Sequence, residues 1–402
     1  MTYFYPGFGT VGGGELLAAS QLDWLRDRGV DVSVVTYDLD EARWGRRLEG
    51  IPVTVVPRRS WRDLFAVDRP IPKLRLRARR AARHLQDGDV VLTANHPCST
   101  MLGQVETPAR RLWQCNEPPR RIHLRGANPF LAARVDATGG KGIEDACAPF
   151  ARRLAAPLGE IAAFDVESVS RLDGIFAISA FSRDNARRIY GRCSEEVVPP
   201  IVRFPGAVSP RAGLDRTGLQ VLVHTRLEVL KNVDTLLRGF ARFRAAACPG
   251  ARIHLVGEGQ HRPRLEALAA ELGLGDVARF HGFLPEAELR KVYAACDVFA
   301  LLPLDEPFGM VFPEAAAQGL LLVGPDHGGP VEILEGGELG FPCDAFDPDA
   351  LAEALARIWA LDDAEVDRRR VATDRACRAR YAADEVGPRL LRALGQPVPA
   401  TR

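Results

Sequence analysis

The chain has 402 residues, more than one ordinary domain holds, so two domains are expected. Hydrophobic residues make up 47% of it, enough for two large cores, and the formal net charge of +1 argues against a general nucleic-acid binder. Eight cysteines without a Cys-x-x-Cys pair indicate neither a zinc site nor a disulfide framework, and the lack of a signal peptide or a bilayer-long apolar run favours a cytoplasmic protein.

The first forty residues predict a βαβ unit, the start of a Rossmann-like sheet. The unit consists of a strand at 3–5, a glycine-rich loop at 6–14, a helix at 15–28 and a strand at 32–36. The loop ends in Gly12, Gly13 and Gly14. Because glycine lacks a Cβ atom, the backbone of this loop can approach a phosphate group.

The same loop also fits a second interpretation. Gly7, Gly9 and Gly12 match the pattern G-x-G-x-x-G, and Asp38 ends the next strand, as in the dinucleotide site of an NAD(P)-dependent oxidoreductase. The glycines continue through Gly13 and Gly14, however, so the helix starts later than that pattern requires. Quenching of tryptophan fluorescence by NAD(P)H, but not by GDP or UDP, would support this alternative.

A basic stretch, Lys73–Arg83, follows in the N-terminal half. It contains one lysine and five arginines. A solvated helix face explains it, and so does a surface that attracts anionic lipid headgroups or an anionic acceptor. The stretch therefore leaves open a peripheral position at the inner face of a membrane.

Strand ends supply two further polar candidates in this half. The predicted strand at 112–115 ends at Asn116, whose amide can form a hydrogen bond with a sugar hydroxyl. His96 follows an earlier strand at 90–93, but most histidines in such positions are structural. A last strand at 173–179 and a helix from 179 to 190 complete the half.

The second half begins with a new sheet after a stretch rich in Pro, Gly, Ala and Arg at 204–218, which places the domain boundary near residue 200. A strand at 219–225 is followed by Arg226 and Lys231 and then by a helix at 233–246. Both cations thus lie where a strand ends and a helix begins, which is where open α/β sheets bind ligands.

The segment 305–314 is a second strand-to-helix turn. An apolar strand at 297–303 precedes it, and a helix starting near Glu314 and closed by Gly319 follows. The amides of Gly309, Met310 and Val311 are expected near the start of that helix, where anions bind. Glu306 and Glu314 flank them, and carboxylates suit hydroxyl groups. Glu306 would bind the hydroxyls of one sugar and Glu314 those of another, with phosphates at the amides between them. This arrangement fits a sugar nucleotide, which consists of a sugar, a diphosphate and a ribose.

Two motifs carry a resemblance to a known family. Glu306 and Glu314, separated by seven residues with Pro-Phe-Gly between them, resemble the EX7E signature of retaining glycosyltransferases of the GT4 type. The segment from Arg226 to Asn232 is similar to the family motif G-R-L-x-x-x-K-[GN], with Thr225 in place of the glycine. Asn116 stands where members often have a histidine.

The resemblance implies an α/β fold of the GT-B class, in which two Rossmann-like domains face each other across a cleft. The domains would be residues 1–199, for the acceptor, and 200–380, for the nucleotide-sugar donor. A C-terminal helix in 381–402 would cross back to the first domain. A single helix is expected from 374 to 394.

The resemblance also implies the roles of the site residues. Glu306, Arg226, Lys231 and Asn116 would be catalytic, and Glu314 would bind the ribose. Phe283 and Leu284 would meet the base, although core packing is an alternative for Phe283. The donor diphosphate would be bound by Arg226, Lys231, Gly309, Met310, Val311, Gly13 and Gly14.

The implied reaction is transfer of a hexose-type sugar, with retention, from a nucleoside-diphosphate sugar to an unidentified acceptor hydroxyl. The donor would be GDP-mannose-like or a UDP sugar, and the acceptor a small molecule, a glycan or a lipid-linked compound. No cofactor and no metal are expected, because no Asp-x-Asp lies at a strand end and no His/Cys cluster occurs. A nucleotide-sugar 2-epimerase or hydrolase, and a silent nucleotide-sugar sensor, are the alternatives on this fold.

Overall fold

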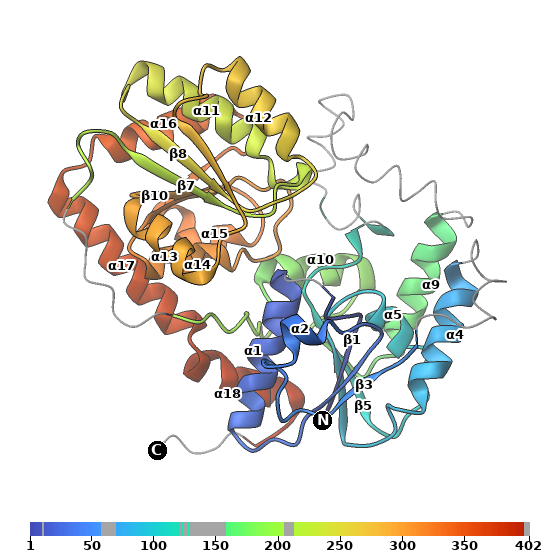
Figure 1. Cartoon of the computed structure of the whole chain (residues 1–402). Coiled ribbons are helices and arrows are strands. Elements are labelled where there is room, and N and C mark those ends of the chain that lie inside the picture. Colours follow the sequence, from blue (N-terminus) through green and yellow to red (C-terminus); the bar gives the residue numbers. More distant parts are fainter. Residues whose placement is uncertain are drawn as a thin grey trace. The chain divides into compact units, whose positions relative to one another are not determined.

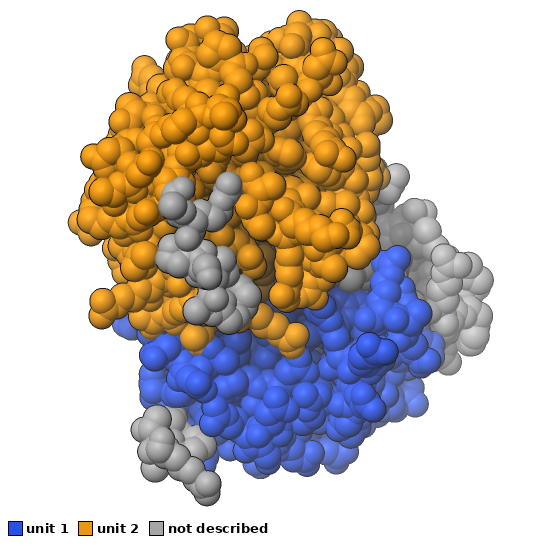
Figure 2. Space-filling model, turned by 60° about the vertical axis from the view of Figure 1, so that its left-hand side comes forward, with its two compact units in different colours: residues 1–201, 383–402 blue, residues 202–382 orange. Residues whose placement is uncertain are grey.

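The chain is described by a computed structural model that covers residues 1–9, 12–57, 70–120, 122–123, 128, 158–204 and 213–397. It divides into two compact units (Figure 2). Unit 1 comprises residues 1–201 and 383–402, and unit 2 comprises residues 202–382. Most of the predicted linker, residues 205–212, lies outside the described residues.

Unit 1 is built on a six-stranded parallel sheet in the order β3-β2-β1-β4-β5-β6. This is the strand order of the Rossmann fold. Strands β2 and β3 are added on one side of β1 and strands β4 to β6 on the other, so the strand order reverses between β1 and β4. The strands are β1 (Thr2–Tyr5), β2 (Ser33–Thr36), β3 (Val53–Val55), β4 (Val90–Thr93), β5 (Arg110–Cys115) and β6 (Gly174–Ala177). Most are short and apolar, as expected of strands covered on both faces.

Alternating side chains of β1 point into two separate cores. Tyr3 and Tyr5 pack with one group of helices, which includes α1 and α18, while Phe4 packs with the other, which includes α4 and α5. The period of two along a strand explains this division. The helices of unit 1 are α1 (Gly13–Asp27), α2 (Glu41–Trp44), α4 (Pro70–Ala82), α5 (Cys98–Leu102), α9 (Leu158–Ser170), α10 (Ala180–Tyr190) and α18 (Ala383–Leu394).

Unit 2 repeats the same topology. Its sheet has the order β12-β11-β10-β7-β8-β9, again all parallel, with the reversal between β7 and β10. The predicted strand at 297–303 is shorter than expected, because only its first half pairs with its neighbours. The strands are β7 (Gln220–His224), β8 (Arg252–Val256), β9 (Ala278–Gly282), β10 (Val298–Ala300), β11 (Leu321–Pro325) and β12 (Phe341–Cys343).

Helices cover this second sheet on both sides (Figure 1). Helices α11, α12 and α16 gather on one side, and α13, α14 and α17 lie on the other. They are α11 (Val233–Ala246), α12 (Arg262–Glu271), α13 (Glu286–Ala295), α14 (Val311–Ala317), α15 (Pro330–Leu334), α16 (Pro348–Trp359) and α17 (Asp363–Tyr381).

The prediction of one helix from 374 to 394 was wrong. Two helices occupy this region, α17 in unit 2 and α18 in unit 1, and they are separated by Ala382, whose backbone is extended (φ −66°, ψ 154°). Helix α18 lies beside α1 (Figure 1), where Arg28 pairs with Asp384 at 2.7 Å. Gly387 allows the contact, because a Cβ there would lie 2.0 Å from the Trp24 ring. The break lets the chain pass from one unit to the other.

Candidate active site

Two loops at the strand reversal of unit 2 bring a lysine and a glutamate into contact. Lys231 ends the short 3₁₀ helix η1 (Val229–Lys231) after β7, and Glu306 lies in the loop after β10. Lys231 Nζ is 2.6 Å from Glu306 Oε2, and the two side chains are 23% and 15% exposed. Partial burial weakens screening by salt, so this ion pair is stronger than one on the open surface. Two residues that the sequence assigned to one site are thus neighbours.

Hydrogen bonds between the two loops fix this pair. Leu304 N donates to Leu230 O at 3.0 Å. The buried Asn232 donates through Nδ2 to Leu302 O at 3.0 Å and to Ala345 O at 2.6 Å. Asn232 has a φ of 55°, a left-handed conformation that asparagine adopts more readily than most residues. Asn232 therefore holds the lysine loop against the glutamate loop.

A glycine turn after β11 supports Glu306 from the other side. Gly329 N donates to Glu306 O at 2.8 Å. A Cβ on Gly329 would lie 2.1 Å from Pro307 O, which no side chain can tolerate without movement of the backbone. Gly328 has a φ of 78° and a Cβ there would lie 3.0 Å from Glu306 O. This close approach explains the Gly-Gly pair after His327.

The helix that carries Glu314 begins at Val311, three residues before the predicted start. Pro313 lies in the first turn, as predicted, where its missing N–H costs no hydrogen bond. Gly309 and Met310 directly precede the helix, and Gly309 takes a φ of 92°. The predicted binding of a diphosphate by the amides of Gly309, Met310 and Val311 stays a prediction.

Arg226 is placed differently from Lys231, although both lie in the loop after β7. Its side chain is 63% exposed, and Arg226 Nη1 lies 3.1 Å from Glu228 Oε1. In this structure the guanidinium therefore pairs with a neighbouring carboxylate and does not share the contact between Lys231 and Glu306. Its predicted role toward the diphosphate stays a prediction.

Glu314 lies in a poorly solvated part of unit 2. Burial raises the pKa of this carboxyl to about 7, and no hydrogen bond to it occurs within the described ranges. Its charge contributes to the raised pKa of Tyr293, after the larger effect of burial, so the two side chains are close. Tyr293 Oη in turn lies 2.9 Å from His224 Nδ1. Burial also lowers the pKa of His224 to about 4, so this imidazole is neutral near pH 7.

Phe283 and Leu284 follow β9 at the same, carboxyl-terminal edge of the sheet. Phe283 is 79% exposed, which makes the alternative of core packing wrong for this residue. Leu284 is half-buried. A flat aromatic face in solvent can stack on a ring of a ligand. The assignment of both residues to the base stays a prediction.

In unit 1 the glycine loop leads directly into α1, which begins at Gly13, two residues earlier than predicted. A Cβ on Gly13 would meet no atom within 4 Å, so this backbone is open to approach. A Cβ on Gly14 would lie 2.7 Å from both Asn95 Nδ2 and Tyr5 Oη, so packing alone requires glycine there. The Glu15 carboxylate lies close to Gly12, and its charge disfavours a phosphate at this turn.

Asn116 follows β5 and is buried, with its Nδ2 donating to Asn95 Oδ1 at 2.7 Å. His96 turns away from this pair, as its Nδ1 lies 3.0 Å from Thr100 Oγ1. Thr100 donates to the buried Asp165, which also accepts from His123 Nε2 at 2.8 Å and Tyr190 Oη at 2.7 Å. His96 therefore belongs to a buried polar cluster, as most such histidines do.

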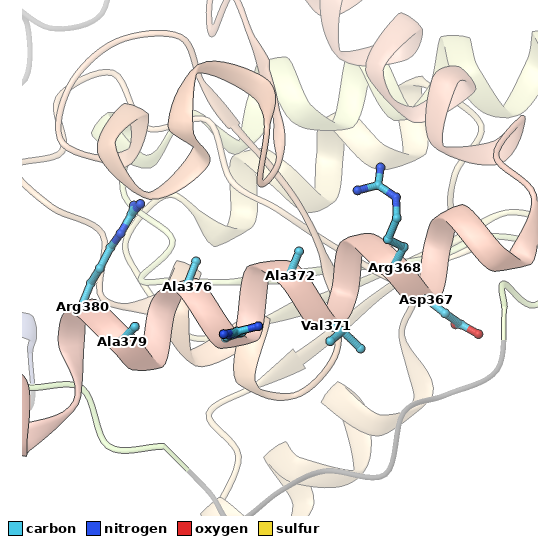
Figure 3. Close-up of a pocket in the computed structure, with 8 residues that line it drawn as sticks. Asp367, Arg368, Val371, Ala372, Ala376, Ala379 and Arg380 are labelled. Carbon is cyan, nitrogen blue, oxygen red and sulfur yellow. The ribbon is translucent and has the colours of Figure 1, made fainter.

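A separate hollow runs along one side of α17 (Figure 3). Small apolar side chains form its floor and charged ones its rim, and none of the predicted site residues lines it. Its lining residues are Asp367, Arg368, Val371, Ala372, Arg375, Ala376, Ala379 and Arg380. They all belong to one helix, so the hollow is a feature of the helix surface.

Comparison with known proteins supports the family resemblance. Residues 209–375 match the family described as glycosyl transferases group 1. Over this segment the chain is similar to the group 1 glycosyltransferases, of the GT4 type. The resemblance inferred from Glu306, Glu314 and the Arg226–Asn232 segment is therefore confirmed.

Two curated relatives illustrate the similarity. A D-inositol 3-phosphate glycosyltransferase of Thermomonospora curvata is 36% identical over 157 residues, which cover 37% of this chain and 36% of that protein. A GDP-mannose-dependent alpha-(1-6)-phosphatidylinositol monomannoside mannosyltransferase of Mycobacterium tuberculosis (strain H37Rv) is 29% identical over 254 residues, 59% of this chain and 62% of the relative. The matched segments thus span from about a third to under two thirds of these relatives.

A solved structure extends the likeness to the whole chain. Anabaena Alr3699/HepE, in complex with UDP and glucose, has a TM-score of 0.70, with 98% of this chain and 99% of that chain covered, at 17% identity. The predicted GT-B fold, two Rossmann-like α/β domains, is confirmed by this likeness and by the two six-stranded parallel sheets.

Some of the residues that position the site could not be recognised from the sequence alone. Asn232 was noted only as part of a motif, and the contact of Gly328 and Gly329 with the Glu306 backbone was not foreseen. A Gly-Gly pair after a strand signals a close backbone approach, but the sequence does not say to which segment. That partner is 20 or more residues away in the chain.

Two kinds of feature are absent from the described residues. Among those residues, no helix is both long enough and apolar enough to cross a bilayer. Within the same ranges, no three His, Cys, Asp or Glu side chains come together in a way that could hold a metal ion.

Proposed function

We propose that this protein transfers a hexose-type sugar from a nucleoside-diphosphate sugar to an acceptor hydroxyl, with retention and without a metal ion. The observation that carries the proposal is the ion pair between Lys231 and Glu306 at the strand reversal of unit 2. Lys231 offers a cation to a phosphate, and Glu306 offers an acceptor to sugar hydroxyls. Donor binding would divide this pair, each partner taking the group that suits its charge.

The reaction needs charge stabilisation on the leaving diphosphate. The acceptor oxygen forms a bond to the anomeric carbon while the bond from that carbon to the diphosphate oxygen breaks. The acceptor proton passes to the leaving phosphate, on the same face of the sugar. Lys231, and Arg226 once it leaves Glu228, would meet the growing negative charge. Glu306 would hold the sugar and would not act as a nucleophile.

The ribose would bind to Glu314, and the exposed ring of Phe283 would stack on the base, with Leu284 beside it. Two donors deserve the first tests. The Mycobacterium tuberculosis relative is named as GDP-mannose-dependent, and the Anabaena structure contains UDP and glucose. The Lys231-Asn232 and Gly-Gly-Pro details favour a GDP-linked mannose-like donor, followed by a UDP sugar.

The acceptor would be a polyol or a lipid-linked glycan. Relatives of this chain are named for inositol 3-phosphate and for a phosphatidylinositol monomannoside. Helix α4 carries the exposed Arg75 and Arg79, and Arg83 follows at the same spacing, which places all three on one side of the helix. Within the described residues, none of the three pairs with a carboxylate. We propose that this arginine stripe attracts anionic headgroups, which would place the enzyme at the inner face of a membrane.

The proposal is tested by measuring nucleotide release and product formation. The protein is first screened by thermal shift against UDP, GDP, ADP and TDP sugars, and the stabilising donors are then incubated with inositol 3-phosphate or lipid-linked acceptors. Acceptor-dependent release of the nucleoside diphosphate, with a new α-linked glycoside in the case of an α-linked donor, is the expected outcome. Release without an acceptor would indicate a hydrolase or 2-epimerase, and inactivity with every donor would refute the transferase.

A further inference from the structure

Three polar side chains of unit 1 form a hydrogen-bonded row beside the glycine loop. Asn116 Nδ2 donates to Asn95 Oδ1 at 2.7 Å, and Asn95 Nδ2 donates to Tyr5 Oη at 2.8 Å. The three residues follow or end β5, β4 and β1, which are adjacent strands of the sheet. The row, called here the Tyr5–Asn95–Asn116 relay, thus crosses the strand reversal of unit 1, where open α/β sheets bind ligands.

The backbone beneath the relay is held on both sides. Trp113 Nε1 donates to Ala94 O at 3.0 Å, next to Asn95. Ser182 Oγ donates to Asn116 O at 2.5 Å, and Ser182 N donates to Ser179 Oγ at 3.0 Å. The peptide groups that carry the two asparagines therefore have little freedom. In such a frame, a side-chain hydrogen bond sets the direction of the amide.

One atom of the relay lacks a partner. Asn116 is 8% exposed, and its Oδ1 accepts no hydrogen bond within the described residues. Leaving a buried carbonyl oxygen without a donor is unfavourable, because the oxygen has lost its hydrogen bonds to water. A ligand that supplies a hydroxyl group would satisfy this oxygen. The carboxylate of Glu15 beside Gly12 disfavours a phosphate at the neighbouring turn, so a neutral donor group fits best.

Gly14 shows how tightly the relay is packed. A Cβ at this position would lie 2.7 Å from Asn95 Nδ2 and 2.7 Å from Tyr5 Oη. The first turn of α1 therefore closes over the middle of the relay. The amide of Asn95 is oriented by its two hydrogen bonds, since Nδ2 donates to Tyr5 Oη and Oδ1 accepts from Asn116 Nδ2.

We propose that Asn95 is a positioning residue for sugar transfer: held by Tyr5, it turns the Asn116 amide so that the free Oδ1 accepts a hydrogen bond from a substrate hydroxyl. This inference rests on the proposed function, and it specifies how the Asn116 amide of unit 1 is oriented toward a substrate. Asn95 acts through Asn116 and touches no substrate. The chemical class recognised is a neutral hydroxyl of a sugar or polyol.

A double-mutant cycle tests this claim in the full-length protein. Asn116→Ala should lower kcat about tenfold, the loss of one hydrogen bond to a substrate hydroxyl. Asn95→Leu should give a similar loss, because the amide of Asn116 is no longer held. The double variant should be no slower than Asn116→Ala, since the two residues act as a unit. Independent losses that multiply to about a hundredfold would overturn the proposal.

Conservative and control variants separate positioning from stability. Asn95→Asp should retain most of kcat, because a carboxylate still accepts from Asn116 and Tyr5 can reverse its hydroxyl. Gln114→Leu removes another buried amide of β5, which donates to Val198 O at 3.1 Å, and should lower the melting temperature without changing kcat. If Gln114→Leu lowers kcat as much as Asn95→Leu does, the effect is structural and the proposal is wrong.

The failure of this inference differs from the failure of the proposed function. If the wild-type protein transfers sugar and Asn95→Leu does so at the same rate, only the relay is refuted. If the wild-type protein transfers no sugar from any donor, the function itself is refuted. Thermal-shift measurements with the nucleoside diphosphate alone provide a further check, because Asn95→Leu should leave its binding unchanged.

Discussion

The two units share one strand order, but the polar residues at their strand reversals differ in kind. In unit 2 the reversal carries a charged pair, Lys231 and Glu306, with both side chains partly exposed. In unit 1 it carries neutral groups, the Tyr5–Asn95–Asn116 relay, with Asn116 buried. One topology therefore supports two kinds of recognition. Charge suits a diphosphate and neutral amides suit hydroxyls, and the difference lies in the loops and not in the sheets.

Asp165 is a fully buried carboxylate of unit 1, and the largest expected effect comes from removing it. Asp165 accepts hydrogen bonds from Thr100, His123 and Tyr190. Asp165→Ala should destabilise unit 1 by about 3–5 kcal/mol, because the buried partners lose their acceptor. Chemical denaturation followed by tryptophan fluorescence reports this, since Trp24, Trp44 and Trp113 all lie in unit 1.

The exposed Asp173, paired with Arg111 at 3.3 Å, provides the control for Asp165. Asp173→Ala should cost below about 1 kcal/mol, as for most surface pairs. The hydrogen bonds to Asp165, led by that of His123, lower its pKa in the folded state despite burial. Its stabilisation is therefore present above the pKa of the unfolded chain and is lost as the pH falls through the folded pKa. An equal loss of stability in Asp165→Ala and Asp173→Ala would contradict the predicted difference between a buried and an exposed carboxylate.

The second prediction concerns the charged pair of unit 2. Lys231→Ala and Glu306→Gln should each lower turnover at least about a hundredfold, or about 2.7 kcal/mol, while the protein stays folded. The reason is that each removes an interaction that matters most in the transition state. Steady-state transfer assays with the donor found by screening measure the loss.

Lys291 and Glu288 offer a matched control, since they form a similar pair at 2.7 Å on the surface of the same unit. Lys291→Ala and Glu288→Gln should keep wild-type turnover. Near wild-type turnover in both Lys231→Ala and Glu306→Gln would remove the assignment of the charged site.

The third prediction uses the raised pKa of Glu314. A carboxyl whose folded pKa is about 7, above its ordinary value of 4.5, destabilises the folded state as the pH rises between these values. Glu314→Gln should therefore match the wild type near pH 4.5 and exceed its stability at pH 8 by roughly 3 kcal/mol. The difference between the two denaturation curves, measured across pH, isolates this group from all others.

Binding of the nucleoside diphosphate should counteract the stability advantage of Glu314→Gln at pH 8. Ribose hydroxyls would solvate the ionised Glu314, so the nucleoside diphosphate should stabilise the wild type more than Glu314→Gln at pH 8. Equal stability of the two proteins at both pH values would show that Glu314 is well solvated. It would then resemble an ordinary surface carboxylate, and its assignment to the charged site of unit 2 would be wrong.

The smallest effect per residue is expected on helix α4, the one charged surface proposed for unit 1. Replacing Arg75, Arg79 and Arg83 by Gln should weaken binding to vesicles with anionic lipids by about 1 kcal/mol per residue. Vesicle co-sedimentation at low and high salt measures the change.

The control for this stripe is the triple variant of Arg242, Arg264 and Arg290, which are exposed arginines of unit 2 that already pair with carboxylates. Their replacement by Gln should leave vesicle binding unchanged. If both triple variants bind vesicles as the wild type does, the arginines of α4 are only a solvated helix face.

Much of the fold could be predicted from the sequence because strands buried on both faces are continuous apolar runs. The runs at 90–93, 112–115 and 297–303 were all recognisable in this way, although the last forms a strand only over Val298–Ala300. Helix boundaries were less certain. The helix of Glu314 begins three residues earlier than predicted, and the break at Ala382 has no Gly or Pro to mark it.

By itself, the sequence determined the residue types of the site and their spacing, since local propensity places Glu306, Lys231 and Asn116 at the ends of strands. Only the tertiary structure decided which of these side chains meet. The contact of Lys231 with Glu306 joins residues 75 positions apart, and the relay joins Asn95 to Tyr5 across 90 positions. Such contacts depend on strand order and on the closeness of packing at Gly14 and Gly329, and no local pattern in the chain encodes either.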